Sequence, residues 1–183
     1  GRFAGGLDDP ARLAGAFAGV TTNIGDNGIT VRGNAPKLMQ WKLEGIEIPN
    51  PNHFGEVGGF GGGGLTALSS LVLGNSDFLT GAFPAEYGNA LAGVFDLKLR
   101  TGNNNRWEHT ASLGTMGIDL SSEGPFKKGG KASYLFNYRY STLWMISSFL
   151  PDGAGQGMKY QDLSLKLISP PKRPVHSQYG ALD

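Results

Sequence analysis

The feature that most constrains this chain is alternation between apolar and polar residues at a period of two. The even positions from 132 to 140 are aromatic or small, and the odd ones are mostly polar. Successive side chains of a strand point to opposite faces, so this segment predicts a strand with one aromatic face. The period returns at Leu163, Leu165 and Leu167, and less regularly from Trp107 to Leu120. These segments are expected to form antiparallel strands.

Two details refine this expectation. The apolar set changes parity between Leu113 and Met116, which predicts a bulge in the first strand. Residues 127–131 combine lysines with Gly129 and Gly130 and predict a tight turn before the aromatic strand. Such strands fit a membrane β-barrel, in which lipid covers one face and water the other. They also fit a soluble antiparallel sheet with one buried face.

Composition limits the classes of function. The chain has 183 residues, of which 30 are Gly and 10 are Pro, so it is rich in turns. Its formal net charge is +1, which gives no reason to expect nucleic acid as a partner. Cysteine is absent, which excludes disulfides, thiolate zinc sites and cysteine nucleophiles. No apolar run reaches the roughly 18 residues that a membrane-spanning helix needs.

The amino-acid composition of the chain changes at the polar stretch 102–105, which is predicted to be a linker. Before it, Asp9 and Pro10 predict a short helix from about Pro10 to Ala18 that ends at Gly19. Strands are expected at 28–33 and over 39–48. The predicted fold class is therefore α+β: a small domain of short strands and helices, followed by antiparallel strands.

The segment 79–97 contains a Gly-x-x-Pro-Ala-x-Tyr-Gly element, at Gly81 to Gly88, and then a Gly-Val strand. It resembles the plug domain of TonB-dependent outer-membrane receptors. Further matches occur in the same order in the initial helix, in the strand 29–33 and in 43–46. The sequence of residues 44–46 and 49–54 most resembles that of receptors of the Bacteroidetes group.

This resemblance implies a plug domain at 5–102, partial β-barrel strands at 107–168 and a tail of unassigned structure at 169–183. The family's barrel has about 22 strands, so the chain is expected to be a fragment of a longer receptor in the outer membrane. The implied partners are a TonB-type energy-coupling protein, outer-membrane lipid and a small-molecule, glycan or peptide ligand. Strands severed from a barrel are expected to self-associate.

The resemblance also suggests functional residues. Plug arginines of the family pair with barrel glutamates, so Arg32 and Glu86 are candidates for charge pairs that lock the plug. The loop from Pro49 to Gly64 is the candidate ligand-binding region. Its proposed contact residues are Asn50, Asn52, His53, Phe54 and Phe60. Ligand bound there would shift the conformational equilibrium of the plug in a gated import.

Three glycines have a physical reading that does not depend on the family. Gly33 and Gly88 stand where a turn would need a positive φ. Gly93 stands beside a strand, where a neighbouring backbone could come close.

Other chemistry has little support. The run 59–64 satisfies Gly-x-Gly-x-x-Gly, but no hydrophobic strand precedes it, so no dinucleotide cofactor is expected. The histidines at 53, 109 and 176 have no partner at i+4 and predict no metal site. Glu44 and Glu47 are not placed as a catalytic pair, and no enzyme is expected. Two alternatives stay open: a secreted β-rich binding module and, more distantly, a nucleotide-dependent enzyme.

Overall fold

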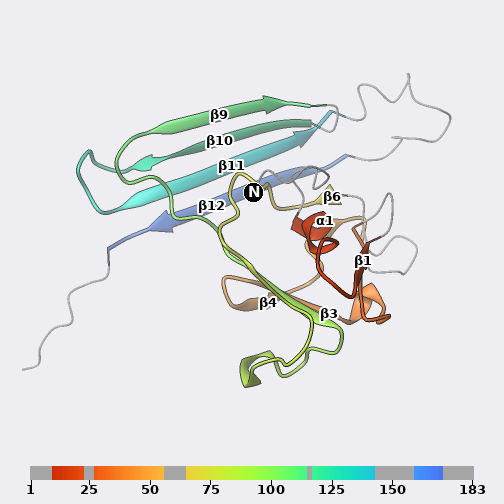
Figure 1. The fold of residues 1–183 in the computed structure, drawn as a ribbon. Coiled ribbons are helices and arrows are strands. Elements are labelled where there is room, and N and C mark those ends of the chain that lie inside the picture. Colours follow the sequence, from red (N-terminus) through yellow and green to blue (C-terminus); the bar gives the residue numbers. More distant parts are fainter. Residues whose placement is uncertain (1–9, 23–26, 56–64, 115–116, 143–158, 171–183) are drawn as a thin grey trace, which may run out of the picture.

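The computed structural model describes residues 10–22, 27–55, 65–114, 117–142 and 159–170. In these ranges the protein is mostly β-strand with few helices, arranged in open sheets (Figure 1). Two four-stranded sheets are accompanied by two two-stranded pairs among the described residues. No helix in the described ranges is long and apolar enough to cross a membrane.

The amino-terminal unit runs from α1 to β8 and contains most of the short elements. It begins with α1 (Pro10–Ala14), β1 (Val20–Thr22), β2 (Ile29–Val31) and the 3-10 helix η1 (Pro36–Leu38). It continues with β3 (Met39–Leu43), β4 (Ile46–Ile48), β5 (Asn52–His53) and β6 (Leu65–Thr66). It ends with β7 (Asp77–Leu79), the 3-10 helix η2 (Ala85–Tyr87) and β8 (Gly93–Leu97).

The central sheet of this unit has the order β4-β3-β8-β7, in which β3 and β8 run parallel. Alternation along β3 turns Met39 and Trp41 toward the hydrophobic core. The Trp41 ring stacks on Phe95 of β8, with 5.2 Å between ring centroids. Residues of α1, β2 and the segment after β6 complete the core: Ala11, Ala14, Ile29, Val31 and Leu68. The unit therefore has a hydrophobic core of its own.

The carboxy-terminal sheet is an antiparallel meander. It consists of β9 (Glu108–Leu113), β10 (Gly117–Pro125), β11 (Ser133–Ser141) and β12 (Gln161–Ile168), each paired with its neighbour in the chain. Its strands lie across the amino-terminal unit, with β12 and β11 closest to β6 (Figure 1). The predicted turn at 127–131 is confirmed, because Gly129 has φ +77° and the Gly130 amide donates to the Lys127 carbonyl.

The predicted bulge between Leu113 and Met116 is wrong. Leu113 of β9 instead pairs with Ile118 of β10, so the two strands form an antiparallel hairpin. The amide of Gly117 and the carbonyl of Gly114 are joined across its end. The change of parity marked a turn between two strands, since a loop of odd or even length resets which residues face each side.

The predicted helix is shorter than expected, because it ends at Ala14 instead of Ala18. The amides of Ala16 and Phe17 donate three residues back, which tightens the turn before Gly19 at φ +76°. The segment 39–48 forms two strands, β3 and β4, which turn at Glu44 and Gly45, with φ +54° and +80°.

Of the three glycine expectations, two are confirmed. Gly33 has φ +79°. A Cβ on Gly93 would lie 3.0 Å from the Leu79 carbonyl oxygen and 3.0 Å from Met39 Sδ, so the close approach is present. The positive φ expected at Gly88 is wrong: Gly88 caps η2 with φ −61° in the right-handed helical region.

Candidate functional site

The carboxy-terminal sheet has its polar side turned inward. Its inner face, which we define by Asp119, Glu123, Asn137, Arg139 and Asp162, meets the amino-terminal unit. Buried polar residues follow this face along β10, β11 and β12, and all are at most 9% exposed: Ser121, Glu123, Ser133, Asn137, Ser141 and Asp162.

The outer face of the same sheet is apolar and exposed. We define it by Leu113, Ile118, Leu120, Tyr140, Leu163, Leu165 and Leu167. Leu113 is 81% exposed and Leu163 is 68% exposed. The pairing register explains the separation, since Leu120, Tyr138 and Leu163 lie opposite one another on neighbouring strands. A soluble sheet buries its apolar side, and this sheet buries its polar side instead.

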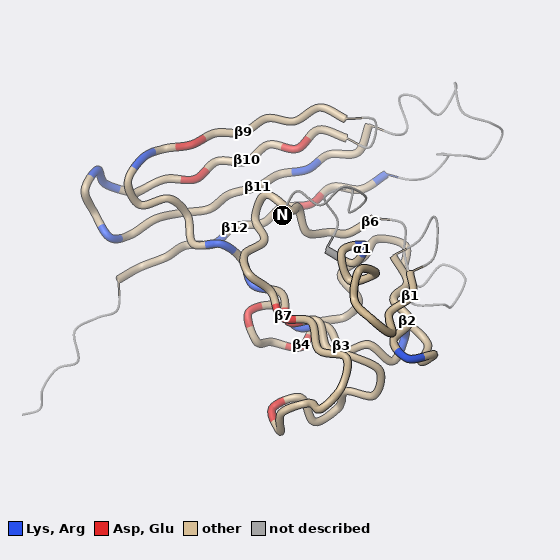
Figure 2. Tube along the Cα trace, viewed as in Figure 1, with Lys and Arg blue, Asp and Glu red and all other residues tan. Residues whose placement is uncertain are grey.

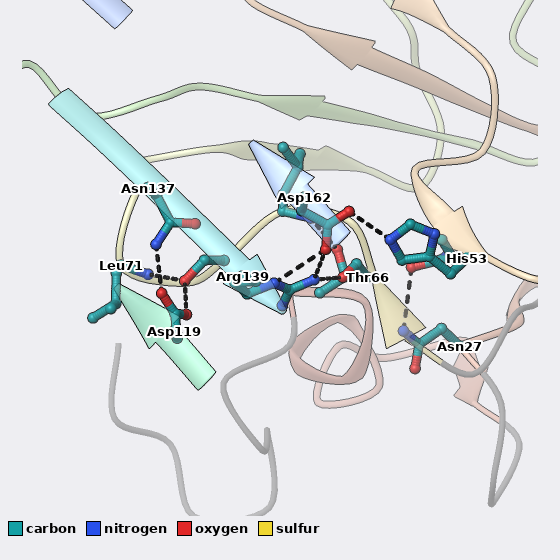
Figure 3. Close-up of polar contacts among 11 residues, drawn as sticks. Asn27, His53, Thr66, Leu71, Asp119, Asn137, Arg139 and Asp162 are labelled. Atoms are coloured by element: carbon teal, nitrogen blue, oxygen red, sulfur yellow. Dashed lines mark hydrogen bonds and ion pairs between the residues drawn. The ribbon is translucent and has the colours of Figure 1, made fainter. Parts of the chain in front are cut away.

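The first inner-face contact is made by a histidine. His53 Nε2 of β5 lies 2.5 Å from Asp162 Oδ1 of β12 (Figure 3). Arg139 Nη2 of β11 lies 2.7 Å from the other oxygen of this carboxylate and also donates to the Thr66 carbonyl of β6. Asp162 is 9% exposed, so its charge is balanced inside the interface by the neighbouring guanidinium.

A second contact lies on β10 and β11. The Ser69 hydroxyl, in the segment after β6, donates to Asp119 Oδ2 at 2.6 Å, and Asn137 Nδ2 donates to the other oxygen at 2.5 Å. The Leu71 amide donates in turn to the Ser69 hydroxyl (Figure 3). The carboxylate therefore receives a hydrogen bond at each oxygen and fixes the loop after β6 on the sheet.

Two further ion pairs involve the segment around β8. Arg100 Nη2 lies 2.9 Å from Glu123 Oε1, and its Nε donates to the Leu71 carbonyl. Lys166 Nζ of β12 lies 2.8 Å from Glu44 Oε1 and donates to the Leu99 carbonyl. The hydrogen bond from Lys166 lowers the pKa of Glu44, and burial partly opposes this shift.

The predicted ligand-binding residues lie close together at β5. Asn50 Oδ1 accepts from the Asn52 amide at 3.1 Å, and Asn52 Oδ1 accepts from Asn27 at 3.2 Å. Phe54, with φ +63°, has its ring centroid 6.1 Å from that of His53. Asn52 is 7% exposed, so its side chain supports the loop from within. Phe60 lies outside the described residues.

The predicted locking residues lie away from the carboxy-terminal sheet. Arg32, with φ +51°, is exposed and lies beside Gly81. Glu86 is exposed in η2, where its carbonyl accepts from Lys42 Nζ at 3.2 Å. Neither side chain makes an ion pair in the ranges that the structure describes. Their locking role stays a prediction.

Sequence reasoning did not identify the residues that make the inner-face contacts: Glu44, Ser69, Arg100, Asp119, Glu123, Arg139, Asp162 and Lys166. One signal was available for the sheet members. Charged residues recur at the positions of the alternating strands that form the polar face. A face in contact with water can use any polar residue and does not require charged ones there. A charge kept on a covered face needs a partner, so these positions mark an interface.

Metal binding finds no support in the described residues, which contain no group of three His, Asp or Glu side chains able to hold an ion. The amino-terminal unit does contain a buried acid, Asp96, which is 7% exposed and accepts from the Tyr87 hydroxyl at 3.3 Å. Burial and the Asp96 charge raise the pKa of Tyr87. This pair lies on the side of β8 that faces η2.

No family model matches the chain, and no curated protein matches it significantly. Among solved structures, the chain is similar to the ferric enterobactin receptor in complex with BCV-L6, at 15% identity and a TM-score of 0.48. This similarity covers 73% of the present chain and 22% of that receptor's chain. The chain therefore spans less than a quarter of the length of the structure it matches.

Proposed function

We propose that this chain is the plug and the first barrel strands of a TonB-dependent outer-membrane receptor, which imports a ligand under the control of the plug. In this proposal residues 5–102 are the plug, 107–168 are barrel strands and 169–183 form a tail. The outer face contacts lipid, and the inner face lines the lumen. The sequence of residues 44–46 and 49–54 favours a receptor of the Bacteroidetes type.

One observation carries the proposal: the sheet turns its apolar face outward while its polar face is covered. Burying polar groups costs stability unless they are paired, and an apolar face left in water gains nothing from burial, so this sheet is stable only when its outer face is covered as well. Lipid can cover such a face when its strands are long enough to cross a bilayer. β10 and β11 each have 9 residues, which matches the roughly 9–11 of a tilted membrane strand.

The inner-face contacts support a gating role. They are ion pairs and hydrogen bonds between separate elements, as at His53 with Asp162 and Arg100 with Glu123. A conformational change of the loop that carries His53 would break such contacts one by one, so ligand bound near Asn50 to Phe54 could shift the plug between two arrangements. The ligand class is a small molecule, glycan or peptide.

The lipid assignment is testable with single cysteines, because the chain has no native cysteine. Leu163→Cys and Leu165→Cys place a nitroxide label on the outer face, and Ser164→Cys places one between them on the inner face. The labelled full chain is reconstituted in phosphatidylcholine vesicles. Collision rates with oxygen, which concentrates in lipid, and with a water-soluble nickel chelate are then measured.

We expect high oxygen and low nickel collision rates at 163 and 165, with the opposite ranking at 164. A secreted β-rich binding module would leave the labels at 163 and 165 in contact with the nickel chelate. Strong spin–spin broadening at these two positions, with the nickel chelate excluded, would mean that a second copy covers the face instead. Either result would overturn the proposed membrane assignment.

A further inference from the structure

One end of the carboxy-terminal sheet carries a cluster of positive charge. Lys127, Lys128 and Lys131 are all exposed in the turn between β10 and β11. Gly129 turns the chain with φ +77°, and the Gly130 amide donates to the Lys127 carbonyl at 2.8 Å. The turn is closed at its base by a hydrogen bond from the Phe126 amide to the Ala132 carbonyl. The three lysine positions therefore lie together at one end of the sheet, on a turn closed by hydrogen bonds (Figure 2).

Aromatic side chains lie directly beside this turn. Phe126 is 60% exposed, and its ring centroid is 5.7 Å from that of Tyr134. Trp107 is 52% exposed, and its indole N–H donates to the Pro125 carbonyl at 3.1 Å. A Cβ on Gly124 would collide with the Trp107 indole, so the ring rests on the backbone of β10. These rings continue the apolar outer face up to the basic turn.

The charge of these lysines has no counter-charge among the described residues. In the part of the chain that the structure describes, none of the three makes an ion pair. The two nearest acids along the strands are already engaged, since Glu108 pairs with Arg106 at 2.6 Å and Glu123 pairs with Arg100 on the inner face. The positive charge is therefore available to a partner outside the chain.

We propose that the turn 127–131, which we call the basic turn, binds the headgroups of anionic phospholipids. Aromatic rings that are apolar with one polar edge settle at the boundary between hydrocarbon and headgroups. Ammonium groups just beyond that boundary lie at the depth of the lipid phosphates. Along the sheet, the apolar face is followed by the aromatic rings and then by the lysines. In a membrane, the hydrocarbon is followed by the interface and then by the phosphates, so the two orders match. This inference rests on the proposed contact of the outer face with lipid.

The test uses flotation of the full chain with vesicles of phosphatidylcholine alone and with vesicles that also contain phosphatidylglycerol. The variant Lys127→Gln/Lys128→Gln/Lys131→Gln removes the charge of the basic turn. A matched single pair, Lys128→Gln and Lys37→Gln, removes one charge at the turn or one from the exposed surface of η1. Each variant is also labelled at Leu165→Cys to report whether the outer face is in lipid.

We expect phosphatidylglycerol to strengthen binding of the native chain by about fivefold for each lysine at the headgroups. The triple variant loses this gain and keeps its binding to phosphatidylcholine. Lys128→Gln loses part of the gain, and Lys37→Gln loses none.

Three results would overturn the inference. The triple variant keeps the full gain, Lys37→Gln lowers it as much as Lys128→Gln, or phosphatidylglycerol has no effect on the native chain. In these cases the label at residue 165 still reports lipid, so the proposed function survives. A label that stays in water on both kinds of vesicle shows instead that the proposed function has failed, and the basic turn with it.

Discussion

His53 Nε2 lies 2.5 Å from Asp162 Oδ1, although 109 residues separate the two in the chain. The same carboxylate accepts from Arg139 Nη2 at 2.7 Å, so it joins the amino-terminal unit to two neighbouring strands. Asp162→Asn keeps the shape and removes the charge. We expect faster hydrogen exchange at β5 and β6, because breaking a covered ion pair costs about 3 kcal/mol or more.

The control for this change is Asp77→Asn, which removes an ion pair with Lys98 on the exposed surface. Such a pair contributes about 1 kcal/mol or less. Exchange at β5 and β6 that is equally slow in both variants would contradict the importance of the Asp162 contact.

Gly93→Ala is expected to destabilise the amino-terminal unit by about 1–3 kcal/mol, because its new methyl group would press against the Leu79 carbonyl and Met39. Chemical denaturation followed by the fluorescence of the core residue Trp41 measures this cost. Gly88→Ala is the matched control, since its backbone is helical and its Cβ would meet only the Ala85 carbonyl, at 4.0 Å. That variant is expected to be neutral or more stable by up to about 1 kcal/mol. The reverse ranking would show that the close approach at Gly93 is relaxed in solution.

The ion pair between Glu44 and Lys166 makes the contact between the amino-terminal unit and the carboxy-terminal sheet depend on pH. The pKa of Glu44 lies below its ordinary value because Lys166 donates to the ionised carboxylate. The stabilisation is therefore complete above the pKa of an unfolded glutamate and is lost as the pH falls through the lowered folded value. A side-chain carboxyl titration by NMR is expected to give a midpoint below that of a free glutamate. Lys166→Gln is expected to move the midpoint up, and an unchanged midpoint would show that the pair does not form.

Arginine on the outer face gives a test of depth. Leu165 lies in the middle of β12, opposite Phe136, while Leu167 lies opposite Tyr134 beside the basic turn. In a bilayer, Leu165→Arg is expected to cost about 2–4 kcal/mol, and Leu167→Arg about 1 kcal/mol or less, in an unfolding titration from vesicles. For a sheet in water, both residues are already exposed and both changes would be nearly neutral.

The strands of the carboxy-terminal sheet could be predicted from local pattern, because the alternation at Tyr134 to Tyr140 and at Leu163 to Leu167 sets the two faces directly. The bulge could not be told from a hairpin, since a parity change at Leu113 accompanies either. The positive φ predicted at Gly88 was wrong for a similar reason, because a glycine that ends a short helix can adopt either helical or left-handed backbone angles.

The inner-face contacts lie beyond local pattern altogether. His53 was singled out as a ligand contact, and its placement against Asp162 depends on how a loop folds onto a strand far along the chain. Likewise, the charge of Arg139 suggests that a partner exists without naming Asp162 or Thr66. The pairing of side chains over such separations depends on the packed fold, so it cannot be predicted from the local pattern around either residue.

Contacts of charge and hydroxyl make up most of the described bonds between the inner face and the amino-terminal unit. Water can replace each of these hydrogen bonds when the two surfaces separate. Added salt is therefore expected to weaken mainly the pair of Lys166 with Glu44, which is partly exposed, because buried pairs such as Arg139 with Asp162 are screened much less.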